Sequence, residues 1–504
     1  MQNSTSIYDT SPQNFNFGGG SQDTVMHPAV AVAMIAVILL ILFRPRKYIA
    51  APLFLFIFLV PTGQQLYFAG VHLYCSRILI LFGCARLLWS KLFHPSNALA
   101  GGLNVVDGVF ATWALYRAGA GILQFMQSGA VVNQVGFLWD ALGMYFLLRF
   151  LIQDQEDIER LFKVFAVVAV VIAAEMVNEH YTKQDLFGTI LGGVRTDLEI
   201  RNGLIRAQAV FQHALIAGSF GAALFPFFVW LWKSGKARIL GVAGMISSVT
   251  IVFASSVSTP VLAFAAGIAA VFAWPVRNYL KYLRYAVVLA VVGLNLVMKA
   301  PVWFLIARID VVGGSTSYHR AELIDVFLKH FSDWWLIGTH MNATWGWDMW
   351  DTANQYVNEG ERGGLVVFVC FVALIWLSYR HLAKARNSEG LNRKTQWFLW
   401  LLGSSLFVHC VAFFGVDYFD QSRVAWYAML AMITAVTTSI LSAKVPSEEP
   451  KEAALADPYP SSAYPAPTRR VSGVAQLERP RQFKPGPSYS RKLEKTGCKS
   501  RSSS

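Results

Sequence analysis

Residues 26–47 read MHPAVAVAMIAVILLILFRPRK, and this stretch decides which class of fold the chain can adopt. Its first eighteen residues contain no Asp, Glu, Lys or Arg. A helix needs about 20 predominantly apolar residues to cross a hydrocarbon core of roughly 30 Å. The stretch therefore predicts a membrane-spanning helix over residues 26–43, which ends at a basic cluster.

The same apolar pattern returns along most of the chain. Hydrophobic residues make up 55% of the sequence and charged residues only 14%, whereas soluble domains carry about 25% charged residues. We predict an all-α polytopic membrane protein with about 12–13 transmembrane helices and two longer outer loops. The further spans are predicted at residues 48–66, 71–90, 103–121, 133–152, 160–177, 213–232, 239–255, 258–275, 285–304, 363–379, 397–415 and 423–442.

Basic residues between the spans predict the orientation of the chain. Residues 1–25 form a polar leader without Lys or Arg, so this segment is no signal peptide and can be translocated outward. Arg44, Arg46 and Lys47 follow the first span, and the positive-inside rule places them in the cytoplasm. The later predicted inner loops are also basic, whereas three short outer loops contain no Lys or Arg. We therefore expect the amino terminus outside and the carboxyl terminus inside.

The carboxyl-terminal segment, residues 443–504, differs in composition from the rest. From Ser442 onward the chain holds twelve Lys or Arg and six Asp or Glu, which supply +6 of the net charge of +13. Its Pro- and Ser-rich composition predicts a disordered basic tail. Most of the other basic residues lie in short loops between the spans, so we expect membrane lipids and no nucleic acid as partners. The five cysteines predict no disulfide, and no Cys/His spacing suggests a metal site or cofactor.

Three of the charged residues inside predicted spans lie at similar depth. Arg77, Arg117 and Asp140 each lie a few residues from the outer end of their span. A charge inside a membrane helix is costly and is a functional hypothesis by default. We predict that Asp140 pairs with Arg77 or Arg117. The pair either fixes helix packing alone or leaves the other Arg free to face a phosphate.

The first long outer loop is predicted over residues 178–212. It contains Arg195 and Arg206, and His213 follows at the mouth of the next span. The amino end of that helix favours an anion, because its amides are unpaired and its dipole is positive there. The guanidinium fork of Arg206 suits phosphate oxygens. The loop therefore predicts a phosphate site, and the alternative is an arginine that binds lipid headgroups.

The second long outer loop is predicted over residues 307–362. It contains three short motifs, Tyr318-His319-Arg320, Gly338-Thr339-His340 and Asp351-Thr352-Ala353-Asn354. Gly363-Gly364-Leu365 then opens the next span. Five tryptophans predict either an interfacial aromatic belt or a surface on which sugars stack; they are Trp334, Trp335, Trp345, Trp347 and Trp350.

The order of these motifs resembles the O-antigen ligase/polymerase superfamily over roughly residues 26–442. Members of this superfamily have about a dozen membrane helices, an arginine-bearing loop before a mid-chain helix, and a large late periplasmic loop. The resemblance implies a bacterial inner-membrane enzyme that transfers a glycan from undecaprenyl diphosphate at the periplasmic face. The acceptor is a glycan or the lipid A core. Carried over, the family's diphosphate-binding arginines match Arg206 and Arg320.

The general base of this transfer stays open. Many ligases have His before the Asn of the late motif, where this chain has Ala353. Asp351 would share a helix face with Asn354 and could deprotonate an acceptor hydroxyl, unless it is a helix N-cap. His340 and His319 are rival bases. A second departure is the Ser-rich segment 254–260, where relatives often carry Ser-Arg.

These observations define one candidate site and two rival functions. Residues 414–421 form an acidic outer loop that holds an acceptor sugar or is a solvated turn. A transporter or flippase, or a non-catalytic export component, are the alternatives to an enzyme; a transporter would show inverted repeats and broken helices near the midplane. The predicted catalytic residues are Arg206, Arg320, Asp351 and His340, and the predicted substrate-binding residues are Arg195, His213, His319, Asn354, Arg77 and Arg117.

Overall fold

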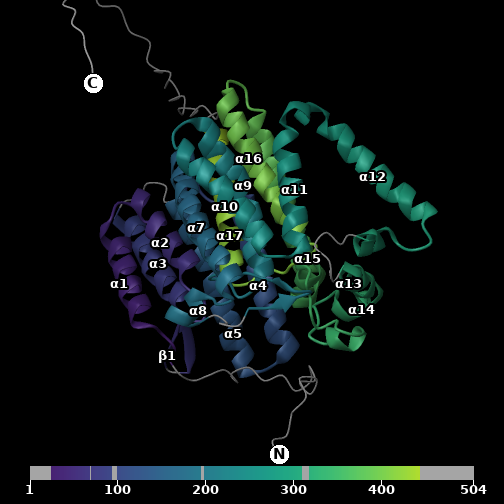
Figure 1. The fold of residues 1–504 in the computed structure, drawn as a ribbon, viewed down its shortest axis with the longest axis horizontal. Coiled ribbons are helices and arrows are strands. Elements are labelled where there is room, and N and C mark those ends of the chain that lie inside the picture. The colour runs from purple at the N-terminus through teal and green to yellow at the C-terminus, as the bar shows by residue number, and fades with distance from the viewer. Residues whose placement is uncertain (1–23, 69, 94–98, 194–197, 309–316, 443–504) are drawn as a thin grey trace, which may run out of the picture. The chain divides into compact units, whose positions relative to one another are not determined.

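The computed structural model describes residues 24–68, 70–93, 99–193, 198–308 and 317–442, and these are almost entirely helical (Figure 1). The predicted tail, and the predicted leader apart from Thr24 and Val25, lie outside the described residues. The helices are α1 (Pro28–Phe43), α2 (Ala50–Leu59), α3 (Cys75–Phe93), α4 (Val105–Phe125), α5 (Ser128–Leu138), α6 (Met144–Leu151), α7 (Gln155–Thr182), α8 (Leu186–Leu191), α9 (Ala214–Ser234), α10 (Arg238–Ala254), α11 (Ser258–Phe272), α12 (Leu280–Val297), α13 (Ser317–Lys329), α14 (Phe331–Trp334), α15 (Gln355–Arg386), α16 (Arg393–Ala412) and α17 (Gln421–Ser442).

A helix lies at each of the thirteen predicted spans, but fewer of these helices meet the requirements for crossing a membrane. Within the described residues, six are long and apolar enough, or seven if the bent pair in residues 285–308 forms one span. The predicted number of 12–13 is therefore not supported by length and composition. Three apolar helices, α1, α10 and α11, have only 16, 17 and 15 residues, below the roughly 20 that a bilayer requires.

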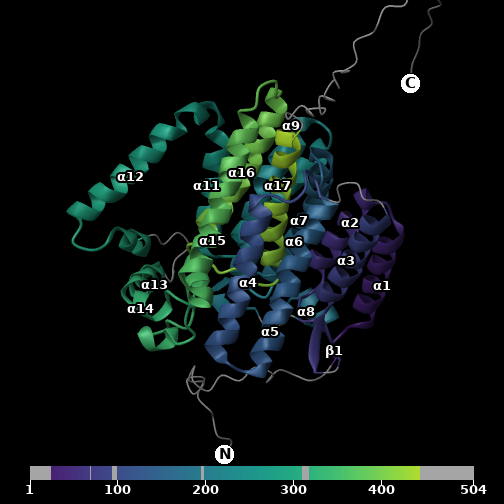
Figure 2. The same cartoon turned by 180° about the vertical axis from the view of Figure 1, so that it is seen from behind.

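Two predicted spans differ from the structure in shape. The span 48–66 ends early, because α2 stops at Leu59 and an antiparallel hairpin follows, formed by β1 (Gln65–Phe68) and β2 (Val71–Tyr74). The span 285–304 is broken, because the 3₁₀ helix Val302–Arg308 bends by 91° from Tyr285–Val297. Figures 1 and 2 show α12 standing apart from the other helices. The apolar pattern of the sequence predicts that these segments are buried or contact lipid, but it does not predict where their helices end or bend.

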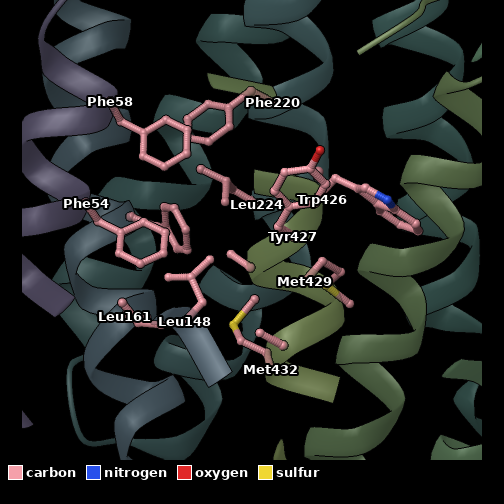
Figure 3. Packing of buried hydrophobic residues seen from close by; sticks show 14 of the residues in the cluster. Phe54, Phe58, Leu148, Leu161, Phe220, Leu224, Trp426, Tyr427, Met429 and Met432 are labelled. Carbon is pink, nitrogen blue, oxygen red and sulfur yellow. The ribbon is translucent and has the colours of Figure 1, made fainter. Parts of the chain in front are cut away.

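The centre of the bundle is α9, whose most apolar window is 89% buried. It packs against α10, α11 and α16. Rings interlock around it: Phe58 of α2 stacks on Phe220 of α9 at 4.9 Å between centroids, and Phe54 meets Phe165 edge-on at 5.3 Å (Figure 3). Apolar side chains gain no hydrophobic energy over lipid, so helix association in a bilayer depends on such van der Waals packing.

Polar contacts tie the long loops to one end of the bundle, which we term the loop end. Gln124 at the end of α4 donates to the carbonyl of Ile337 at 2.5 Å. The backbone N–H of Gln355, which begins α15, donates to the carbonyl of Phe413 after α16 at 2.9 Å. The second hairpin, β3 (Ile200–Arg201) and β4 (Leu204–Ile205), precedes α9. The loop end therefore collects both predicted long loops.

Candidate functional site

The loop end brings together residues from α13, from the loop before α15 and from the segment before α9. Arg320 of α13 lies within electrostatic range of Arg206, Arg201 and Asp351. Asp351 in turn lies within range of His319 and His213. We term Arg206, Arg320, His319, Asp351 and His213 the arginine site. It unites five of the residues that the sequence predicted, from two loops more than 100 residues apart.

Arg320 is the most unusual member of the arginine site. Its residue is 8% exposed, and its Nε atom is buried without a hydrogen-bond partner in the described structure. Burial, together with repulsion from Arg206 and Arg201 and against the opposing effect of Asp351, lowers the pKa of Arg320 to about 10. The group is thus still a cation at neutral pH. A buried, unpaired charge is unfavourable, so an incoming anion would be strongly stabilised there.

Arg206 is held differently. Its Nη1 atom lies 3.0 Å from both carboxylate oxygens of Glu199, and its side chain is 19% exposed. Its backbone N–H also donates to the Glu199 carbonyl at 2.9 Å. An anion that binds Arg206 through this nitrogen therefore competes with Glu199. Arg195, also predicted here, lies outside the described residues.

The late motif is arranged differently from the prediction. Asn354 is the N-cap of α15, and its side-chain oxygen accepts from the N–H groups of Tyr356 at 3.0 Å and Val357 at 3.3 Å. Asp351 precedes the helix, so it neither shares a helix face with Asn354 nor caps the helix. Asn354 is 1% exposed and its side-chain oxygen is occupied as a cap, while its predicted role in substrate binding stays a prediction.

Asp351 instead faces a histidine and a second aspartate. The ligand atoms of His319, Asp348 and Asp351 lie within 4.8 Å of one another, so these three residues could hold a metal ion. One ring nitrogen of His319, Nε2, lies 3.1 Å from the Asp351 carbonyl oxygen. Partial burial raises the pKa of the Asp351 carboxyl, whereas His319 lowers it. A carboxylate with a raised pKa is a better proton acceptor.

His340, the rival base, lies elsewhere at the loop end. Its ring packs on Phe125 of α4 with 4.6 Å between centroids. Burial lowers the pKa of His340, so its neutral form is favoured. His340 is not among the groups whose charges act on Arg320 or Asp351. Of the predicted bases, the structure thus brings Asp351 and His319 to the arginine site but not His340.

The three charges predicted at similar depth, Arg77, Arg117 and Asp140, belong to two separate pairs. Arg77 Nη2 lies 2.8 Å from Asp140 Oδ2, which confirms the predicted pairing for Arg77. Arg117 pairs with Glu359 of α15 at 3.1 Å instead, and Trp113 Nε1 donates to the same carboxylate at 2.8 Å. Arg117 is therefore not free to face a phosphate. A small cavity at this pair is lined by Trp113, Arg117, Gln355, Glu359, Phe371, Phe413, Tyr418, Arg423, Trp426 and Tyr427.

The acidic loop 414–421 lies beside the first long loop. Thr62 connects the two, because it hydrogen-bonds Asp420 at 3.4 Å and Gln212 at 3.1 Å. Phe419 packs edge-on against His213 at 5.8 Å. Burial raises the pKa of Asp420, while Arg423 lowers it. The acidic loop therefore lies next to the arginine site, as an acceptor-binding role requires.

Sequence reasoning missed Glu359, Glu361 and Arg423. Glu361 accepts from Thr352 at 2.7 Å and thereby holds the residue next to Asp351. The signal was present, because Glu359, Glu361 and Arg362 stand directly before a long apolar run. The sequence prediction assigns this segment to the loop 307–362, whereas α15 begins at Gln355 and is interrupted by non-helical backbone at Gly363 and Gly364.

Gly338 shapes the turn between the two halves of the late loop. Its φ is +83°, and a Cβ there would lie 2.1 Å from the Glu361 carbonyl oxygen. We expect Gly338→Ala to destabilise the protein by about 1–3 kcal/mol or more, from strained backbone and the clash. Thermal unfolding in detergent measures this. Gly346→Ala in the same loop, with extended backbone and room for a Cβ, is the control; equal melting temperatures would contradict the expectation.

Comparison with known proteins adds no family assignment. No protein-family model matches the chain, and no curated protein sequence matches it. The function proposed below therefore rests on the arginine site and on the order of the sequence motifs.

Proposed function

We propose that this chain is a membrane glycosyltransferase of the O-antigen ligase/polymerase type. It transfers a glycan from undecaprenyl diphosphate to an acceptor, either another glycan or the lipid A core. The observation that carries the proposal is Arg320, a buried guanidinium without an ion-pair partner among the described residues, in range of Arg206 and Asp351. Two cations and a carboxylate supply the charges that diphosphate departure and hydroxyl activation require.

The proposed membrane arrangement places the loop end in the periplasm of a bacterial inner membrane. It includes the thirteen crossings inferred from the sequence, an odd number that gives a periplasmic amino terminus and a cytoplasmic carboxyl terminus. The far ends of α1, α7 and α9 support this orientation, because they carry basic residues, as the positive-inside rule expects. Two of these basic residues form ion pairs: Arg46 with Asp157 at 2.8 Å, and Lys236 with Glu159 at 2.9 Å.

The proposed reaction is a single displacement at the anomeric carbon. Arg320 and Arg206 bind the diphosphate. They stabilise the negative charge that develops on the diphosphate as the bond between the anomeric carbon and the diphosphate oxygen breaks. The acceptor hydroxyl attacks this carbon while Asp351 takes its proton, and undecaprenyl diphosphate leaves with the bonding electrons. The exposed rings of Trp347 and Trp350 offer faces on which sugars stack.

Arg206 supplies a first test of this proposal. We expect Arg206→Ala to lower transfer at least tenfold in a strain that lacks the chromosomal gene. Glu199→Gln should retain transfer, because it removes the competitor of the substrate and leaves the cation. Gel analysis of surface polysaccharide measures both; loss of chain-length ladders indicates polymerisation, and free lipid-linked polymer indicates ligation. Wild-type ladders with Arg206→Ala would count against the proposal.

A transporter or flippase is the second candidate, favoured by the interruption of α15 at Gly363 and Gly364. Broken helices near the midplane are typical of transporters. The interruption here lies near the loop end, because Gly364 packs on the carbonyl of Leu336. The gene deletion separates the two functions. Lipid-linked glycan accumulates at the periplasmic face if transfer is lost, and at the cytoplasmic face if transport is lost.

A further inference from the structure

Three buried carboxyl groups meet away from the arginine site. Glu175 and Glu179 lie in the last turns of α7, and Asp185 immediately precedes α8. Their exposed fractions are 7%, 0% and 0%. One ligand oxygen of each lies within 4.8 Å of the others. We term these three residues the carboxylate cluster.

Backbone amides donate to all three members of this cluster, and the side-chain amides of Asn178 and Gln208 lie within hydrogen-bonding range of Glu175 and Asp185. No Lys, Arg or His within the described ranges forms an ion pair with any of the three. Glu175 accepts from the backbone N–H of Leu186 at 2.7 Å, and Asp185 accepts from that of Gly188 at 3.0 Å. Glu179 accepts from the backbone N–H groups of Gln208 at 2.7 Å and Ala209 at 2.8 Å.

A separate observation shows that the cluster is incomplete. Among the described residues, Asp185 Oδ2 is fully buried and has no hydrogen-bond partner, although the other oxygen of Asp185 accepts from Gly188. Buried polar atoms are nearly always hydrogen-bonded or bound to an ion or water. An oxygen of this kind, in a group of carboxylates, points to a missing cation.

The charge, burial and chemistry of the ligand oxygens decide which cation fits the cluster. Like charges at such separations oppose ionisation of all three groups, and burial opposes it further. Ca²⁺ takes about 6–8 oxygen ligands in flexible geometry, whereas Mg²⁺ usually keeps several of its waters, so a set of carboxylates as buried as this one suits Ca²⁺ better. The cluster contains oxygen ligands and no thiol or imidazole, which suits a hard cation rather than a transition metal.

We propose that Glu175, Glu179 and Asp185 bind a Ca²⁺ ion. The ion neutralises the carboxylates and joins the end of α7 to the start of α8. Through Glu179 it also fixes the backbone of Gln208 and Ala209, two and three residues after Arg206. It is thus a structural ion of the first long loop, and its binding does not depend on the transfer activity proposed above.

The test uses the full-length protein in detergent, stripped with a chelator and then dialysed against millimolar Ca²⁺. We expect about one Ca²⁺ per chain by elemental analysis, and a melting temperature about 3 °C higher than without the ion. Asp185→Asn and Glu175→Gln should lose both the bound ion and the shift. In chelator, these variants should melt no lower than the wild type, because each relieves repulsion among the carboxylates.

Two control variants locate the ion. Glu156→Gln changes a carboxylate at the opposite end of α7 whose side chain is 73% exposed, and Asp348→Asn changes the carboxylate group near His319. Both should keep the bound Ca²⁺ and the shift. The proposal is overturned if the wild type binds no Ca²⁺, if only Mg²⁺ raises the melting temperature, or if Asp185→Asn and Glu175→Gln keep the ion. The proposal is also overturned if Asp348→Asn is the one variant of the four that loses the ion.

Discussion

Glycan transfer falls at least 100-fold in Arg320→Ala, while the protein stays in the membrane at the wild-type level; this is the largest effect on activity that we expect. Preorganised charges in a water-poor site are worth about 10²–10³ in rate each. Arg320 is buried and lacks a carboxylate within ion-pair distance among the described residues. Arg320→Lys should also fail, because an ammonium cannot match phosphate oxygens with a planar fork.

The stability of a further variant, Arg320→Met, separates a role of Arg320 in substrate binding from a role in folding. Removing an unpaired buried charge is favourable for the fold, so Arg320→Met should melt no lower than the wild type while transfer is lost. Lys329→Gln, on the same helix with its side chain 70% exposed, is the control and should keep transfer. A wild-type polysaccharide ladder in Arg320→Ala would refute this role, and a large drop in melting temperature would make Arg320 a structural residue.

Glu359→Ala should cause the largest loss of stability, about 3–5 kcal/mol, because it leaves a buried cation without its partner. Arg117 is 7% exposed and Glu359 0% exposed. The same carboxylate accepts from Trp113 at 2.8 Å and from Gln355 at 2.6 Å, so the substitution strands three donors at once. Thermal unfolding in detergent, with protein yield from the membrane, measures the loss.

A double variant isolates the contribution of the pair itself. Arg117→Leu combined with Glu359→Leu should be more stable than Glu359→Ala, because no charge is then left buried and unpaired. Asp140→Ala is the matched comparison for an ion pair nearer solvent, since the side chain of Asp140 is 39% exposed. It should cost less than Glu359→Ala. Equal losses from Glu359→Ala and Asp140→Ala would show that burial of the pair is unimportant.

Helix positions could be predicted where a single segment contains the whole signal. The span predicted at 26–43 is α1, Pro28–Phe43, and the span predicted at 423–442 is α17, Gln421–Ser442. The predicted spans 48–66 and 71–90 include residues 65–66 and 71–74 of the hairpin, because the segment QLYFAGVHLY is largely apolar and aromatic. Such residues suit a strand as well as a membrane helix, and only pairing between β1 and β2 distinguishes the two.

The candidate site was predictable in its residue types but not in its pairs. The sequence drew attention to Arg206, Arg320 and Asp351, and the structure brings them within electrostatic range of one another. The sequence could not show that Arg206 has a local ion-pair partner in Glu199, whereas Arg320 has none within the part of the chain that the structure describes. Nor could it show the carboxylate cluster, which three ordinary acidic residues form only when α7, α8 and the segment before α9 meet.

The sequence by itself determined the helical class and the approximate place of each helix, since an apolar run must satisfy its own backbone within about one turn in either direction. It also determined which charged residues stand at unusual positions. Only the tertiary structure decided how these charges are matched. The partner of Arg117 is 242 residues away in the sequence, and a contact over that separation depends on how helices pack, which no local pattern encodes.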